Sequence, residues 1–387
     1  MRTRRCGSAR HVRIAVLALC LGACSASDPV PTGDAGPRDA RVNGRESGTL
    51  ADAVSSCRAS WALPTVTGQP GGCAKRAGDY TPGDAADGWP PCVSDDGAYH
   101  PFDPSISSAA RVAAFEEIRS RLLGGDAPSR QAFVDARVAY SQPEGLLSRV
   151  ARREDEHVAP AAKACADMTA DELSASRDRC AGPAQILPLL TQAFAAGAQG
   201  TEPLTSAARV EAGLLWFLYL SVHKEALTCA SNRKDCDSSQ AYYHGGAPRS
   251  GGLGLARYVR DLSAQAHDRV WDGLLAVRCW RDLDPADKAE QLDLRGKAVG
   301  QLDRALLRGL ALLVKARVQA AADAGCEAAR AALWNSAQLV GRILEREARL
   351  RDAAQAEALR AELSRPRVEA RAVSAVHGAV EALFPCP

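Results

Sequence analysis

The chain has 387 residues, of which 46% are hydrophobic, 24% charged and only 5% aromatic. An apolar fraction near the globular mean, with 32 glycines that follow no period, excludes the collagen-like and wholly disordered classes. The longest apolar stretch of the body, 214–222, includes Ser221 and is far shorter than the roughly 20 residues of a membrane span. This excludes a polytopic membrane protein.

The first 24 residues contain a basic start, a short apolar segment and a cysteine. Five arginines occur before residue 14, the apolar segment covers 14–21, and Leu21-Gly22-Ala23-Cys24 follows. An apolar segment of this length is too short to span a membrane and is typical of a signal peptide. The last four residues resemble the lipobox of bacterial lipoproteins, which implies cleavage before Cys24 and acylation of that cysteine. An ordinary secretory signal with an incidental cysteine is the alternative.

A lipid anchor on Cys24 would hold the mature chain at the cell envelope, because two or three acyl chains bind a membrane stably. Ser25 follows the anchor, where lipoproteins retained in the inner membrane carry aspartate, so we expect the outer membrane. Loss of the signal peptide leaves 43 basic against 46 acidic side chains, and the formal charge changes from +2 to −3. This balance predicts no binding to nucleic acid or to anionic lipid, so the membrane is expected as a partner through the anchor alone.

The mature body contains ten cysteines, which predict disulfides. They are Cys57, Cys73, Cys92, Cys165, Cys180, Cys229, Cys236, Cys279, Cys326 and Cys386. An even number of cysteines in an exported chain indicates up to five disulfides. Short spacing favours the pairs Cys165–Cys180 and Cys229–Cys236, each of which would close a small loop. A zinc site is the weaker alternative, because no pair has Cys-x-x-Cys spacing.

Composition divides the chain into four parts. The predicted signal peptide covers 1–23, and lipidated Cys24 begins a flexible tether over 24–50 that is rich in Ser, Pro, Gly and Asp. Residues 51–105 combine Gly and Pro with three cysteines and two tryptophans, which predicts an irregular segment held on the body by disulfides. The pattern of residues 106–387 is helical, so we expect an all-α fold, a multi-helix bundle.

The body has apolar residues at helical spacing and almost no strand-like alternation. A capping box of Thr169 and Glu172 predicts the start of a short helix, and a further helical turn is expected near Tyr242. The other predicted helices, in chain order, cover 107–123, 129–141, 144–158, 184–197, 204–229, 253–281, 285–323, 327–363 and 367–384.

Glu154 and His157 form the first candidate metal site. They lie three residues apart on the predicted helix 144–158, which would put a carboxylate and an imidazole on one face, as in carboxylate-bridged iron bundles. Such a site needs a second Glu-x-x-His, which the sequence lacks. A salt-bridged helix end, with Arg152 paired to Glu156, is the alternative.

His223 and His267 are the other candidate ligands. His223 continues the apolar stripe of Trp216 and Leu220, so it should point into the bundle, and His267 lies near Trp271. A buried neutral histidine with a hydrogen bond is the alternative for His223. Convergence of two or three histidines inside the bundle would create a transition-metal site for iron or zinc.

The stretch 240–246, with the glycines at 251–254, is the most distinctive local feature. Tyr242, Tyr243 and His244 are followed by small residues, and such a loop can approach a ligand closely. The stretch resembles a segment of the imelysin-like and algal iron-assimilatory families, in which a helix ends in an aromatic pair and small residues. The resemblance implies an exported helical protein associated with iron, although the Gly-x-His-x-x-Glu motif of imelysin-like proteins is absent. Packing of the tyrosines under the loop is the alternative.

The sequence lacks the His-Glu-x-x-His, Gly-x-Ser-x-Gly, Walker and Cys-x-x-Cys-His patterns of common catalytic and cofactor sites. We therefore expect a cell-envelope lipoprotein that acts as a non-enzymatic helical binding or scaffold module. A periplasmic protein that binds or handles iron or zinc is the alternative. A hydrolase that uses the same histidines and carboxylates is a third hypothesis.

Overall fold

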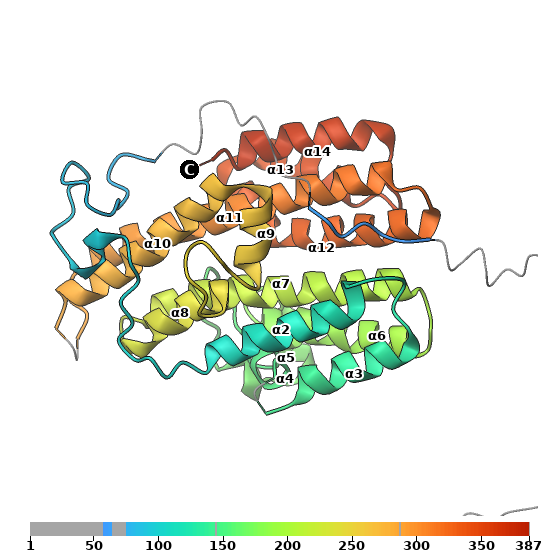
Figure 1. The fold of residues 1–387 in the computed structure, drawn as a ribbon, viewed down its shortest axis with the longest axis horizontal. Coiled ribbons are helices and arrows are strands. Elements are labelled where there is room, and N and C mark those ends of the chain that lie inside the picture. The colour runs from blue at the N-terminus through green and yellow to red at the C-terminus, as the bar shows by residue number, and fades with distance from the viewer. Residues whose placement is uncertain (1–56, 64–74, 144, 286–287, 387) are drawn as a thin grey trace, which may run out of the picture. The chain divides into compact units, whose positions relative to one another are not determined.

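The structure, a computed structural model, describes residues 57–63, 75–143, 145–285 and 288–386. The predicted signal peptide, Cys24 and the tether lie outside the described residues. Within these residues the regular secondary structure is helical and includes no strand, which confirms the all-α prediction (Figure 1). An irregular amino-terminal segment precedes the helices, also as predicted.

Helices α2 to α8 form the first part of the bundle. Their bounds are α2 Ser108–Leu123, α3 Arg130–Ser141, α4 Leu147–Val150, α5 Ala170–Ala175, α6 Leu187–Ala198, α7 Pro203–Thr228 and α8 Lys234–His244. A 3-10 turn at Cys165–Asp167 precedes α5, and a π-helical turn at Gly182–Ile186 precedes α6. The predicted helices 107–123, 129–141 and 204–229 agree with α2, α3 and α7.

Helices α9 to α14 form the second part of the bundle. Their bounds are α9 Leu255–Leu262, α10 Ala264–Leu283, α11 Leu292–Asp323, α12 Glu327–Arg351, α13 Ala353–Leu363 and α14 Ala370–Leu383. In Figure 1, α7 lies between this group and the first group, and it contacts α6, α8, α11 and α12.

Helix α7 is the central helix, because nearly all of its side chains are apolar or small. Between Leu204 and Ala226 only Arg209 and Lys224 are not buried. A helix that is apolar all round has to lie in a core. The polar side chains that α7 does bury, Glu211 and His223 among them, must therefore find partners inside the bundle.

The predicted helix 144–158 is wrong, because only the short α4 forms there. The backbone N–H of Asp155 donates to the carbonyl of Arg179 at 2.7 Å, and the Asp155 carboxylate accepts the backbone N–H of His157 at 3.0 Å. Aspartate competes in this way for the donors that a helix would use. Glu154 and His157 consequently lie on an irregular turn and do not share a helix face.

Two predicted long helices are each divided by a capping residue. The segment 253–281 is α9 and α10, and the hydroxyl of Ser263 accepts an N–H in the first turn of α10 at 3.2 Å. The segment 327–363 is α12 and α13, and the carboxylate of Asp352 accepts two N–H groups of α13 at 2.9 and 3.0 Å. Serine and aspartate are preferred at helix N-caps, so each restarts the helix in a new direction. The segment 285–323 corresponds to α11, which begins later than predicted.

The irregular segment before α2 is fixed to the helices by disulfides and hydrogen bonds. The disulfide Cys57–Cys326 ties it to the start of α12, and Cys92–Cys279 ties it to α10. Its regular element, among the residues described, is the 3-10 helix η1 at Val93–Asp96. The backbone of Tyr80 exchanges two hydrogen bonds with the amide of Gln301 on α11, at 2.8 and 2.9 Å. The segment is therefore an irregular layer that packs on α10 and α11.

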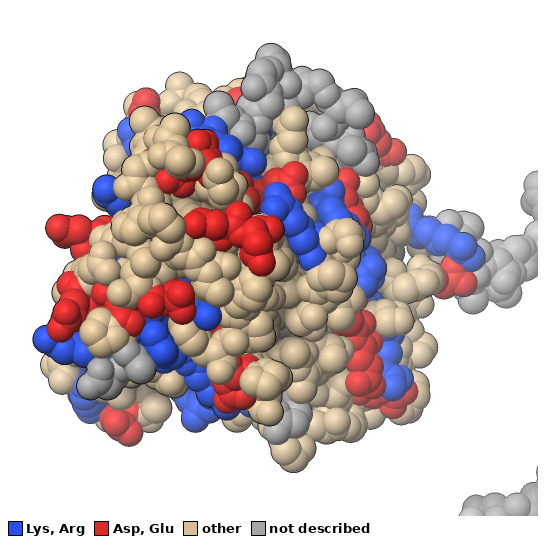
Figure 2. Space-filling model, turned by 60° about the vertical axis from the view of Figure 1, so that its left-hand side comes forward, with Lys and Arg blue, Asp and Glu red and all other residues tan. Residues whose placement is uncertain are grey.

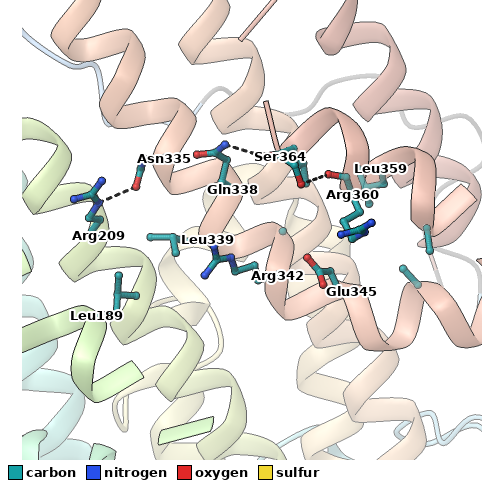
Figure 3. A pocket seen from close by; sticks show the side chains of 14 residues that line it. Leu189, Arg209, Asn335, Gln338, Leu339, Arg342, Glu345, Leu359, Arg360 and Ser364 are labelled. Atoms are coloured by element: carbon teal, nitrogen blue, oxygen red, sulfur yellow. Dashed lines mark hydrogen bonds between the residues drawn. The ribbon is translucent and has the colours of Figure 1, made fainter. Parts of the chain in front are cut away.

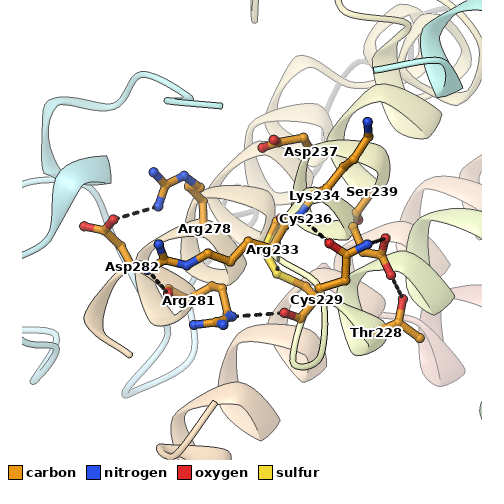
Figure 4. The surroundings of a disulfide bond; sticks show 12 residues. Thr228, Cys229, Arg233, Lys234, Cys236, Asp237, Ser239, Arg278, Arg281 and Asp282 are labelled. Atoms are coloured by element: carbon orange, nitrogen blue, oxygen red, sulfur yellow. Dashed lines mark hydrogen bonds and ion pairs between the residues drawn. A yellow bond between two sulfur atoms is a disulfide. The ribbon is translucent and has the colours of Figure 1, made fainter. Parts of the chain in front are cut away.

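The two short-range cysteine pairs expected from spacing are disulfides in the structure. Cys165–Cys180 closes the segment that contains α5, and Cys229–Cys236 joins the end of α7 to the first turn of α8 (Figure 4). Nε of Arg281, a buried side chain of α10, donates to the carbonyl of Cys229 at 3.0 Å. This corner is thus held both within itself and to α10.

No helix among the described residues is long and apolar enough to cross a membrane. Basic and acidic side chains are intermingled on the face drawn in Figure 2. This mixture agrees with the near balance of charge in the sequence.

Candidate metal centre

In the part of the chain that the structure describes, one group of side chains has the arrangement of a metal site: His157, His223 and Asp303. One ligand atom of each lies within 4.8 Å of the other two. Three separate segments supply them: the turn after α4, helix α7 and helix α11. Two imidazoles and one carboxylate are a ligand set for zinc or iron(II).

The turn after α4 holds His157 in place by packing and ion pairing. The carboxylate of Glu154 accepts a hydrogen bond from Nε of Arg179 at 2.8 Å, which joins the turn to the segment before α6. Gly182 lies directly against the turn. A Cβ atom at Gly182 would lie 2.2 Å from the carbonyl oxygen of Val150, so only glycine fits there.

The imidazole of His157 lies between two carboxylates. Its Nδ1 is 2.6 Å from Oδ1 of Asp155, and its Nε2 is 3.2 Å from Oδ1 of Asp303. The hydroxyl of Tyr219 donates to the same oxygen of Asp303 at 2.9 Å and lies 3.3 Å from Nε2 of His157. His223, one turn after Tyr219 on α7, stacks on His157 with ring centroids 3.6 Å apart. Polar groups of α7, α11 and the turn thus face one another inside the bundle.

Burial and hydrogen bonding set the protonation of this group. Burial alone would lower the pKa of His157, but hydrogen bonds to Asp155 and Asp303 outweigh it and raise this pKa to about 9. Burial lowers the pKa of His223 to about 4. Burial would raise the pKa of Asp303, yet its hydrogen bond with His157 holds this pKa well below its usual range. At neutral pH the metal-free group therefore contains a His157 imidazolium, a neutral His223 and an ionised Asp303.

The arrangement fits a metal ion in place of the proton on Nε2 of His157. Tetrahedral zinc binds imidazole and carboxylate at about 2.1 Å, which puts its ligand atoms about 3.4 Å apart. The separation of 3.2 Å between His157 Nε2 and Asp303 Oδ1 already has this size. Asp155 accepts the Nδ1–H of His157, and such a carboxylate orients a ligating imidazole and makes it more basic. His157 and Asp303 can thus supply two ligands as they lie, and His223, which stacks on His157, supplies a third when its ring turns toward the ion.

The group borders a cavity of 680 Å³. The cavity wall includes Asp155, His157, Trp216 and Tyr219. His223 is only 6% exposed and lies on the adjoining, buried part of α7. An ion can therefore reach the group from the cavity through the side on which His157 and Tyr219 lie.

Glu154 and His267 are not part of this group, contrary to prediction. The carboxylate of Glu154 forms an ion pair with Arg179 at 2.8 Å. Nδ1 of His267 is 2.9 Å from the hydroxyl of Tyr243, and its Nε2 is 2.8 Å from the carbonyl oxygen of Arg249. His267 is therefore a buried histidine with a hydrogen-bond partner on each ring nitrogen.

The side chains of Tyr242, Tyr243 and His244 lie in the core, where they are 2%, 0% and 1% exposed. This position agrees with packing under the loop and not with direct contact to a ligand. Residues 246–248, which follow them, line a second cavity of 680 Å³ together with Trp271. The ring of His244 lies 5.0 Å from the ring of Trp271, and within the described structure neither of its nitrogens has a hydrogen-bond partner.

A smaller cavity of 380 Å³ is lined by residues of α6, α7, α12 and α13 (Figure 3). Arg209 donates from Nε to Oδ1 of Asn335 at 3.0 Å across this cavity, and Arg342 also lines it. Its lining includes neither histidine nor cysteine.

Sequence reasoning missed Asp303, Asp155 and Tyr219. Asp303 is one of many acidic residues on the charged helices of this chain, and no motif distinguishes it. Tyr219 did carry a signal, because it lies four residues before His223 and so shares its helix face. Two polar groups on one face of a helix that is otherwise apolar indicate a polar partner inside the bundle.

No family model matches the sequence, and comparisons with curated proteins and with solved structures give no match.

Proposed function

We propose that this chain is a lipid-anchored protein of the cell envelope that binds a transition metal ion, iron or zinc, through His157, His223 and Asp303. In this proposal the protein is a non-enzymatic helical binding module, and the metal ion is its ligand. Acylation of Cys24 and a location at the outer membrane belong to the same proposal, supported by the lipobox-like sequence and Ser25.

The convergence of two imidazoles and a carboxylate inside the bundle carries this proposal. A buried histidine normally bonds to a hydroxyl or a backbone carbonyl, as His267 does. His157 instead bonds to two carboxylates, those of Asp155 and Asp303, and His223 stacks on its ring. Buried charges are costly unless they are paired or coordinate a metal. A divalent ion would bring all three side chains into one charge-balanced site.

Metal titration of the exported full chain tests this proposal. We expect the chelator-treated protein to bind close to one equivalent of zinc or iron(II), measured by elemental analysis after desalting. His223→Ala should abolish this binding. Within the described structure His223 contributes ring stacking and no hydrogen bond, so its replacement removes a ligand and leaves the hydrogen bonds of His157 intact.

His267→Ala is the matched control, because it removes another buried histidine outside the group. We expect it to bind as much metal as the wild type. Far-ultraviolet circular dichroism establishes that both variants are folded. Equal metal content in folded His223→Ala and wild type, or no metal in the wild type, would contradict the proposal. The second outcome would leave the His157 network as a purely structural set of ion pairs.

A further inference from the structure

The wall of the cavity beside the metal group carries four arginines and three carboxylates. Its arginines are Arg177, Arg342, Arg346 and Arg349. The last three have i, i+4 and i+7 spacing, so α12 presents them on one face. Arg177, Arg342 and Arg349 are exposed, so water hydrates their charges, and a cluster of this kind at one cavity attracts anionic ligands.

The carboxylates of the cavity wall pair with only some of its arginines. Its carboxylates are Asp155, Asp178 and Glu345. The carboxylate of Asp155 is already bonded to Nδ1 of His157. Arg349 and Arg346 are 3.5 and 3.6 Å from carboxylate oxygens of Glu345 and Glu347, which is too long for strong hydrogen bonds. Arg342 forms no ion pair or hydrogen bond with any residue that the structure describes.

Arg346 on α12 and His157 of the metal group line the same cavity. One bound ligand can therefore contact both the guanidinium and the imidazole side of the cavity.

Apolar side chains complete the lining. Trp216 and Leu350 line the same cavity, and Trp216 extends from α7 next to the basic face of α12. An aromatic ring beside guanidinium groups suits a ligand with a flat apolar part and a charged end. The volume of 680 Å³ is in the range of small-molecule sites.

We propose that this cavity binds a small organic anion, whose carboxylate or phosphate group pairs with Arg342 and Arg346 and whose apolar part packs on Trp216. Guanidinium groups recognise both oxyanions through paired hydrogen bonds. This site is additional to the metal site and does not require a bound metal.

Isothermal titration of the chelator-treated full chain tests the site with four probes. Phenyl phosphate and benzoate carry both parts of the ligand, inorganic phosphate carries only the charge, and benzyl alcohol carries only the ring. We expect the two aromatic anions to bind more tightly than either partial probe, and the tighter of the two identifies the oxyanion. Their affinity should fall as salt is added, because exposed charges are screened.

Arginine variants test whether the anion binds at this cavity wall. Arg342→Gln and Arg346→Gln should each weaken binding of the tighter anion by about tenfold, or about 1.4 kcal/mol, because each removes one charged hydrogen-bond donor. Arg137→Gln, on the exposed surface of α3, is the matched control and should bind like the wild type. Absence of binding by both aromatic anions, or equal affinity in wild type and the two cavity variants, would overturn the inference. Neither result bears on zinc binding, which is measured separately with His223→Ala.

Discussion

His157 is held as an imidazolium by its two carboxylate neighbours, and this state governs how a metal would bind. Its pKa in the metal-free protein is about 9, while burial lowers the pKa of His223 to about 4. A metal ion needs the lone pair of Nε2, so binding below pH 9 must release one proton from His157. His223 is already neutral at neutral pH and releases none.

We therefore predict that the apparent association constant for zinc rises about tenfold per pH unit from about pH 6 to about pH 9 and then levels off. The sign follows from the raised pKa, because protons compete with the metal throughout this range. Competition against a chelator of known proton and metal affinities measures the slope. An association constant that does not change between pH 6 and 9 would show that His157 is not a ligand.

Asp155→Asn provides the control for this slope. The amide can still accept the Nδ1–H of His157, but it lacks the negative charge that helps to raise the pKa of that imidazole. The association constant should then level off at a lower pH than in the wild type. At high pH the variant should bind more weakly, because a carboxylate partner makes the imidazole a better ligand.

At the scale of single residues, the sequence indicated two of the three proposed ligands, His157 and His223. His157 and His223 are rare residue types, and the apolar stripe on α7 showed that His223 would point inward. Asp303 is one of 46 acidic side chains in the sequence, and its role depends on how α11 packs against α7. That packing brings together residues 84 positions apart, such as Tyr219 and Asp303, which local pattern cannot encode.

At the scale of elements, the turn that carries His157 depends on close packing against the π-helical turn before α6. A Cβ atom at Gly182 would lie 2.2 Å from the carbonyl oxygen of Val150 and 2.5 Å from that of Arg153. Both neighbours are backbone atoms, so a methyl group can fit only if the turn moves. The position of His157 is thus set by a glycine 25 residues further along the chain.

We predict that Gly182→Ala lowers the free energy of unfolding by about 1–3 kcal/mol, the usual cost of overpacking, and weakens zinc binding. Urea unfolding followed by circular dichroism measures the first effect, and zinc titration the second. Gly378→Ala in α14 is the control, since a Cβ atom there meets nothing within 4 Å. It should stabilise the protein by about 0.5–1 kcal/mol and leave zinc binding unchanged. Normal stability and normal zinc affinity of Gly182→Ala would contradict this account of the turn.

Some helices were predicted correctly from the sequence and others were not, and the difference lies in the residues that interrupt the helical segments. Helices α2, α3 and α7 agree with the apolar periodicity. The predicted helix 144–158 fails because the carboxylate of Asp155 accepts the backbone N–H of His157. The segments 253–281 and 327–363 divide at Ser263 and Asp352, which cap the second helix of each pair. Single Ser and Asp residues are common inside helices as well, so their identity alone does not show where a helix restarts.

At the scale of the whole molecule, buried arginines join segments that are distant in sequence. Arg317 on α11 is 1% exposed and donates to both carboxylate oxygens of Glu211 on α7, at 2.9 and 3.1 Å. The hydroxyl of Tyr258 on α9 donates to the same carboxylate at 2.5 Å, and the guanidinium lies 4.9 Å from the ring of Trp61. One ion pair thus connects three helices and the amino-terminal segment.

The contribution of this network to stability can be tested by mutation. A buried charge without a partner destabilises a protein more than the intact pair stabilises it. We predict that Glu211→Gln lowers the free energy of unfolding by about 3–5 kcal/mol, since it leaves the positive charge of Arg317 buried and unpaired. Combining Glu211→Leu with Arg317→Met removes both charges, and the double variant should be more stable than Glu211→Gln. Urea unfolding with the disulfides kept oxidised measures all three proteins. A loss below about 1 kcal/mol in Glu211→Gln would mean that water or another group compensates Arg317, and that the ion pair does not hold α7 against α11.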